Sequence, residues 1–180
     1  MMIVTAFAAA GAMLLVWAGV DHVREPAVSA ARLGIFRSQH GRSVVAALGV
    51  SEIAVGVTAL AALAVSTPVG RWPLAAQGAL YLGFLGYLLV RYRRNDRGDC
   101  ACARTSAQIG AAGLLRAGTL AVASIAAAAS YPAAALPSAP PTGANVVLGV
   151  AASLALCLLL HALPPAVDGL ARRIGTRRYA

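Results

Sequence analysis

The sequence predicts an all-α fold, a polytopic bundle of helices that span a membrane. Hydrophobic residues make up 59% of the 180 residues, charged residues make up 12%, and the mean hydropathy is +0.75. A soluble domain of this size usually carries about twice that share of charged residues. Each of five apolar stretches comes close to the ~20 residues that a helix needs to cross a bilayer core: 2–20, 44–65, 74–90, 109–129 and 146–163. Backbone groups in lipid must be bonded internally, so these stretches are expected to be helices.

The first stretch has two interpretations, a secretory signal peptide or a retained helix. It lacks a basic segment at its start, and its apolar run is longer than the 7–15 residues usual for a signal peptide. We therefore expect residues 2–20 to form a retained helix.

The distribution of arginine predicts how the chain is threaded. Thirteen of the 15 basic residues lie in segments 21–43 and 91–106 and in the C-terminal tail. The remaining two are Arg71, on the other side of the predicted membrane, and Arg116, inside a span. Short arginine-rich loops stay in the cytoplasm. The N-terminus is therefore expected outside and the C-terminus in the cytoplasm. Because long apolar runs separate the arginines, the net charge of +9 does not indicate a nucleic-acid partner.

Prolines predict the structure of two of the connecting segments. Pro26 is expected to open a short helix over 27–36 that lies in the cytoplasmic interface. Four prolines between residues 131 and 143 predict an extended outer connector. We therefore predict a four-helix unit over 1–130, a proline-rich outer loop over 131–145, and an appended fifth helix with a basic tail over 146–180.

Two charges fall inside predicted spans. Glu52 lies about 12 Å below the cytoplasmic start of the second span, and Arg116 about 10 Å below that of the fourth. An isolated charge at such a depth costs at least ~2.5 kcal/mol. We therefore expect Glu52 and Arg116 to form an ion pair inside the bundle. The pair either fixes helix packing or polarises a site for a quinone, a proton or a thiolate.

Cys100 and Cys102 form a Cys-x-Cys pair just before the fourth span. Arg97, Arg104 and the nearby helix N-terminus favour their thiolate forms, as a dithiol relay requires. Inert thiols in a reducing compartment are the alternative. Cys157, inside the fifth span, is better explained as a small packing residue.

Histidines could extend this cluster. His22 and His161 with the cysteine pair could in principle bind zinc, but the spacing fits no recognised zinc pattern, so no metal site is predicted. Asp21 and His22, at the cytoplasmic end of the first span, are candidates for proton transfer.

The order of these features resembles the MauE branch of the DoxX-like membrane proteins over residues 1–130. That family has a Lys-Leu-Arg-Asp-Pro loop after its first helix, a glutamate in its second, a Cys-Gly-Cys-Phe-Gly motif after its third, and an Arg-Asn pair in its fourth. The corresponding segments here are 22–26, 51–56, 99–103 and 115–117. Ala101 replaces the glycine, Ala103 and Arg104 replace Phe-Gly, and Ala117 replaces the asparagine.

The resemblance implies a multi-pass protein of the bacterial inner membrane that supports thiol–disulfide electron transfer or the maturation of a partner redox enzyme. MauE-like proteins are implicated in methylamine utilisation, through the maturation of methylamine dehydrogenase. Cys100 and Cys102 would then be the exchanging pair, with Glu52 and Arg116 shaping a buried polar site and a quinone as the candidate cofactor. Whether the chain is an enzyme stays open. The alternative is a non-catalytic subunit of a larger membrane assembly. A transporter is disfavoured because no inverted repeat is evident.

Overall fold

A computed structural model describes residues 2–34, 39–65, 68–94, 110–130 and 143–177 of the chain. Every regular element in these ranges is a helix, and no strand occurs among them. In chain order, the elements are α1 (Met2–Arg24), α2 (Pro26–Leu33), α3 (Gln39–Val65), the short 3₁₀ turn η1 (Pro68–Gly70), α4 (Arg71–Arg93), α5 (Ala111–Ser130) and α6 (Gly143–Arg177).

Five of these helices, α1, α3, α4, α5 and α6, are long and apolar enough to cross a membrane. The predicted all-α bundle of spanning helices is therefore confirmed. Most of the helices run past the apolar stretches that predicted them; α1, for instance, continues to Arg24. Polar residues at a span end can keep the helical conformation in the interface, because their side chains reach the headgroups.

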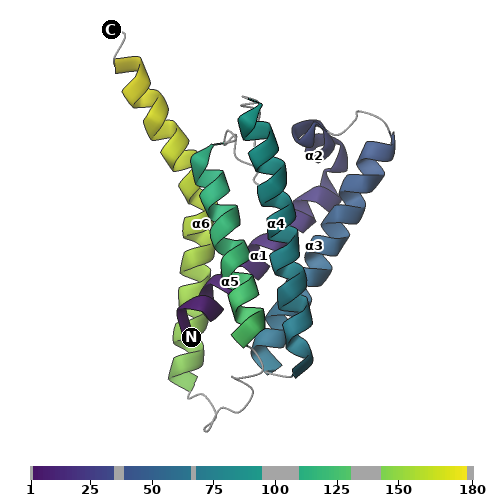
Figure 1. Cartoon of the computed structure of the whole chain (residues 1–180), viewed down its shortest axis with the longest axis vertical. Helices are drawn as coiled ribbons and strands as arrows, with labels where there is room; N and C mark the ends of the chain where they lie inside the picture. The colour runs from purple at the N-terminus through teal and green to yellow at the C-terminus, as the bar shows by residue number, and fades with distance from the viewer. Residues whose placement is uncertain (1, 35–38, 66–67, 95–109, 131–142, 178–180) are drawn as a thin grey trace.

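The five long helices run alternately up and down, and α1 crosses the bundle at a tilt (Figure 1). α1 packs against α3, α5 and α6, whereas α4 packs mainly against α5 and also against α3. The arginine-bearing ends of α1 and α4 lie at the same end of the bundle as α2, and Arg71 begins α4 at the opposite end. We call the end with α2 the arginine end.

The short helix α2 begins at Pro26, as predicted, and ends at Leu33, three residues before the predicted end at residue 36. Pro26 occupies its first turn, and Gly34 caps its C-terminus in the left-handed conformation at φ 66°, which glycine adopts without strain. Residues 35–38 lie outside the described part of the chain. The buried residues of α2 face α3. Helix α4 also contacts α2, because the Tyr87 hydroxyl donates to the Leu33 carbonyl oxygen at 2.9 Å.

Hydrogen bonds fix α4 against the central helix α1. Gln77 Nε2 donates to the Ala8 carbonyl oxygen at 2.8 Å, and the Tyr81 hydroxyl donates to the Gly11 carbonyl oxygen at 2.7 Å. Both donor side chains are buried. Van der Waals packing and such interhelical hydrogen bonds drive helix association in lipid, where the hydrophobic effect contributes little.

The last helix, α6, is held less tightly than the others. It packs mainly along α1, and a smaller share of it is buried than of any other described spanning helix. It also extends beyond the rest of the bundle at the arginine end (Figure 1).

Candidate functional site

The site begins at a close crossing of α1 and α3. A Cβ atom built on Gly19 would lie 2.6 Å from the Gly49 carbonyl oxygen, and one built on Gly49 would lie 2.7 Å from the Gly19 carbonyl oxygen. Real Cβ contacts are never this short, so only glycine fits at either position. Small residues of this kind let helix backbones touch in a membrane. Three residues after Gly19 on α1 and three residues after Gly49 on α3, two side chains come within reach of each other across this crossing.

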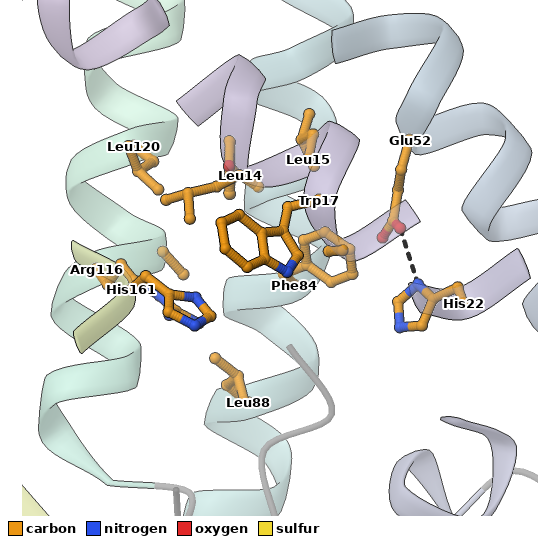
Figure 2. A pocket seen from close by; sticks show the side chains of 13 residues that line it. Leu14, Leu15, Trp17, His22, Glu52, Phe84, Leu88, Arg116, Leu120 and His161 are labelled. Carbon is orange, nitrogen blue, oxygen red and sulfur yellow. Dashed lines mark hydrogen bonds and ion pairs between the residues drawn. The ribbon is translucent and has the colours of Figure 1, made fainter. Parts of the chain in front are cut away.

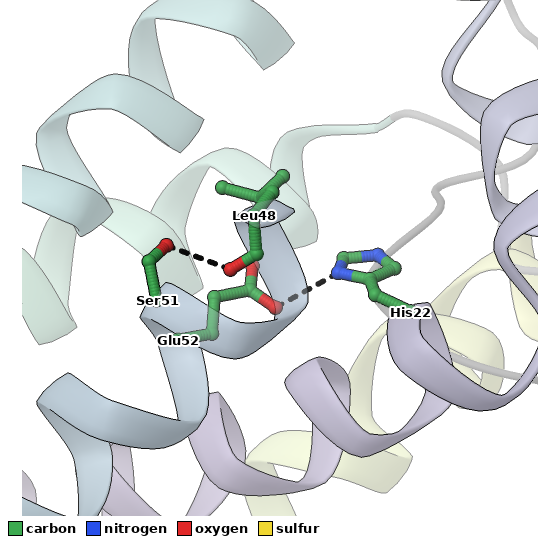
Figure 3. A network of polar contacts seen from close by, with 4 residues as sticks. All are labelled: His22, Leu48, Ser51 and Glu52. Atoms are coloured by element: carbon green, nitrogen blue, oxygen red, sulfur yellow. Dashed lines mark hydrogen bonds and ion pairs between the residues drawn. The ribbon is translucent and has the colours of Figure 1, made fainter. Parts of the chain in front are cut away.

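Those two side chains are His22 and Glu52. His22 Nδ1 lies 2.8 Å from Glu52 Oε2, and the two residues are 2% and 0% exposed (Figure 3). Glu52 stands at the middle of α3, where a carboxyl group is costly without a partner. The adjacent Ser51 turns away and donates to the Leu48 carbonyl oxygen of its own helix at 2.7 Å. Glu52 is therefore directed into the bundle and Ser51 out of it.

Each member of this pair has a second polar atom that takes no part in the contact between them. His22 Nε2 and Glu52 Oε1 are buried and have no hydrogen-bond partner among the described residues. A buried polar atom left unpaired costs about 1–3 kcal/mol. Both residues line a cavity of about 40 Å³ inside the bundle, which is large enough to hold water. One nitrogen of His22 and one oxygen of Glu52 therefore remain able to form a further hydrogen bond beside the cavity.

The opposite wall of this cavity comes from α5 and α6. Arg116 is 9% exposed, and its Nη1 lies 3.4 Å from the Leu160 carbonyl oxygen of α6. The His161 ring stacks on Trp17 of α1, with ring centroids 5.0 Å apart and an interplanar angle of 24°. In Figure 2, Trp17 and Phe84 lie between the His22–Glu52 pair on one side and Arg116 with His161 on the other.

The prediction of an ion pair between Glu52 and Arg116 is wrong. Both residues are buried and line the same cavity, but the partner of the Glu52 carboxyl group is His22. The reason is the order of helices around the bundle. α1 packs against both α3 and α5, and its side chain Trp17 lies between the two charges. Depth in the membrane, which the sequence predicts, does not specify which helices are neighbours.

Comparison with known families adds a second observation. Residues 1–130 match the family described as methylamine utilisation protein MauE. The chain belongs to the MauE family. Comparisons with curated proteins and with solved structures gave no match. The match covers α1 to α5 and ends at the last residue of α5, so α6 lies outside it.

Within this MauE-family protein, residues from three separate motifs meet at the cavity. His22 comes from the last turn of the first span, Glu52 from the second span and Arg116 from the fourth, and all three line the cavity. Asp21 is half-buried beside His22 on α1 but does not line the cavity. Cys157 is buried on α6. Cys100 and Cys102 lie outside the described residues.

The sequence did not indicate the aromatic part of the cavity. Trp17 is 48% exposed, yet one face of its ring stacks on His161. Phe84 and Tyr81 of α4 also line the cavity, with ring centroids 6.3 Å apart in an edge-to-face arrangement. These two residues are three apart on α4, a spacing that can indicate a shared helix face. In a helix that is apolar on all sides, however, this spacing does not show which face is buried.

Proposed function

We propose that this MauE-family membrane protein supports thiol–disulfide electron transfer, with Cys100 and Cys102 as the exchanging pair. The observation that carries the proposal is the buried His22–Glu52 pair, which lines an internal cavity and whose Nε2 and Oε1 atoms have no partner among the described residues. Dithiol oxidation releases two protons with two electrons, so a site for it inside a membrane needs groups that accept protons. Membership of the MauE family supports the same function.

The chemistry balances as two steps. A partner dithiol first reduces the Cys100–Cys102 disulfide by exchange, which leaves the partner oxidised and Cys100 and Cys102 as thiols. A quinone then takes two electrons and two protons from these thiols, which restores the disulfide and forms a quinol. His22 and Glu52 would pass protons at the cavity, and Arg116 would stabilise negative charge that develops there.

Chain connectivity supports this proposal. α4 ends and α5 begins at the arginine end, and the segment that contains both cysteines joins them. By the positive-inside rule, this end faces the cytoplasm of a bacterial inner membrane, with the N-terminus outside. The partner is a redox protein that can reach Cys100 and Cys102.

A thiol-trapping experiment tests the function. In a Cys157→Ser background, membranes are alkylated with a mass-tagged maleimide before and after reduction. We expect a fraction of the chain to gain two tags only after reduction, and Cys102→Ser to carry one tag under both conditions. Glu52→Gln is expected to slow reoxidation of the reduced pair at least tenfold. Two tags on every molecule before reduction, in growing and in oxidant-treated cells alike, would contradict the proposal.

One observation favours a second candidate, a non-catalytic subunit of a larger membrane assembly. α6 lies outside the family match and presents most of its described surface outward, including Val147, Leu148 and Leu158. A partner helix could pack on this surface. In that case Cys102→Ser leaves the activity of the assembly intact, whereas deletion of α6 releases the protein from it.

A further inference from the structure

A second hollow lies next to the cavity, between α3 and α4. It measures about 560 Å³, within the range of small-molecule sites, and its lining is almost wholly apolar. Leu48, Ser51 and Val55 of α3 and Ala79, Gly83 and Phe84 of α4 form most of its wall. We call it the α3–α4 groove.

The α3–α4 groove opens toward lipid at mid-membrane depth. Ser51, Ala79 and Gly83 are exposed, and Gly83 lies one residue beyond the midpoint of α4. The polar atoms at its rim already have partners: Ser51 donates to its own helix, and the Tyr87 hydroxyl donates to the Leu33 carbonyl oxygen. The groove therefore offers apolar contact alone, and a ligand reaches it through the hydrocarbon of the bilayer.

Phe84 separates the groove from the cavity. Its half-buried ring belongs to the lining of both hollows, and on the inner side it packs near Tyr81. Behind it, His22 Nε2 and Glu52 Oε1 are buried without a partner among the described residues. The apolar groove and the cavity lined by the His22–Glu52 pair thus share one aromatic side chain as their common wall.

We propose that the α3–α4 groove binds a prenylated quinone, whose chain lies in the groove and whose ring passes Phe84 to reach His22 and Glu52. This inference rests on the proposed function and names its electron acceptor. A quinone has the features that the two hollows require: it dissolves in lipid, carries an apolar chain, and has a flat ring with two oxygen atoms that accept hydrogen bonds. A fatty acyl chain would leave the polar atoms of the cavity unpaired.

The size of the cavity defines the role of Phe84. A cavity that binds benzene measures about 150 Å³, whereas this one measures about 40 Å³. A quinone ring therefore enters only when the Phe84 side chain rotates into the groove. Trp17 and Tyr81 then flank the ring, and Arg116 lies on the far wall, where its positive charge favours the reduced oxygen atoms.

The chain offers a matched pair of glycines for the test. A Cβ atom at Gly83 or at Gly86 meets no atom within 4 Å, so a side chain can start at either position without a backbone clash. Only Gly83 lines the groove. Both glycines lie within α4, where leucine is the better helix former. Gly83→Leu should therefore fill the groove, and Gly86→Leu should leave it open.

Fluorescence of Trp17 reports on the cavity. The sequence holds two tryptophans, so Trp72→Phe leaves Trp17 as the sole emitter. The protein, with Cys100, Cys102 and Cys157 changed to serine, is placed in phospholipid nanodiscs and titrated with a benzoquinone or a naphthoquinone that carries the same prenyl chain. The prenyl alcohol of equal length is the control for binding of the chain alone.

We expect saturable quenching by at least one quinone and none by the alcohol. Gly83→Leu should weaken binding at least tenfold, Gly86→Leu should change it less than twofold, and Glu52→Gln should weaken it severalfold. Quenching that rises linearly and equally in both leucine variants would overturn the inference. Because the thiols are absent from this assay, that result would leave the thiol-trapping outcome, and with it the proposed function, to stand separately.

Discussion

The two sides of helix α3 pack in opposite ways. On the side of α1, Gly19 and Gly49 bring the backbones into contact, and the crossing holds His22 against Glu52. On the side of α4, the two helices pack over part of their length and leave the α3–α4 groove between them, and hydrogen bonds also attach α4 to α1. One helix thus combines a rigid polar contact with an opening to lipid. The proposed electron transfer to a quinone would use both sides: a fixed pair that binds protons, and a route by which a lipid-soluble molecule arrives.

The largest expected effect comes from breaking the polar contact. His22→Leu leaves the Glu52 carboxyl group buried with no partner, and Glu52→Leu does the same to His22. We expect each to lower the free energy of unfolding by about 3 kcal/mol, and the double variant to lose much less than the sum. Denaturation in mixed detergent micelles measures these values. The Glu52→Leu and Arg116→Leu pair is the control, expected to be additive within ~0.5 kcal/mol because these groups do not touch.

A smaller effect is expected from filling the glycine crossing. A Cβ at Gly49 would lie 2.7 Å from the Gly19 carbonyl oxygen and 2.8 Å from His22 Cβ. Gly49→Leu must therefore push α1 from α3, at a cost of about 1–3 kcal/mol. Gly83→Leu, on the open side of α3, should stay within ~0.5 kcal/mol of the wild type. Equal losses at the two positions in thermal unfolding would show that the two sides of α3 do not differ.

The smallest effect concerns the hydrogen bonds that hold α4 on α1. Tyr81→Phe removes the donor to the Gly11 carbonyl oxygen and keeps the ring that lines the cavity. We expect a loss of about 1 kcal/mol. Unfolding in detergent measures it, and a value near zero would mean that packing alone sets the width of the groove.

The sequence was sufficient for the fold but only partly for the site. Spanning helices follow from the length of apolar runs, a local property, and the five predicted spans agree with the five long helices. The short helix α2 was predictable for the same reason, from Pro26. The depth of Glu52 in the membrane could also be predicted from the sequence, but its partner could not. Which helix lies beside α3 depends on contacts between glycines far apart in the chain, and no local pattern encodes them.

The stack of His161 on Trp17, with the contact from Arg116 to Leu160, has a consequence for a version of this chain cut after α5. In such a chain nothing would cover that wall, and the guanidinium group would meet hydrocarbon, which tolerates it poorly. A C-terminal helix that buries little of its own surface can therefore still be what shields a buried arginine from lipid.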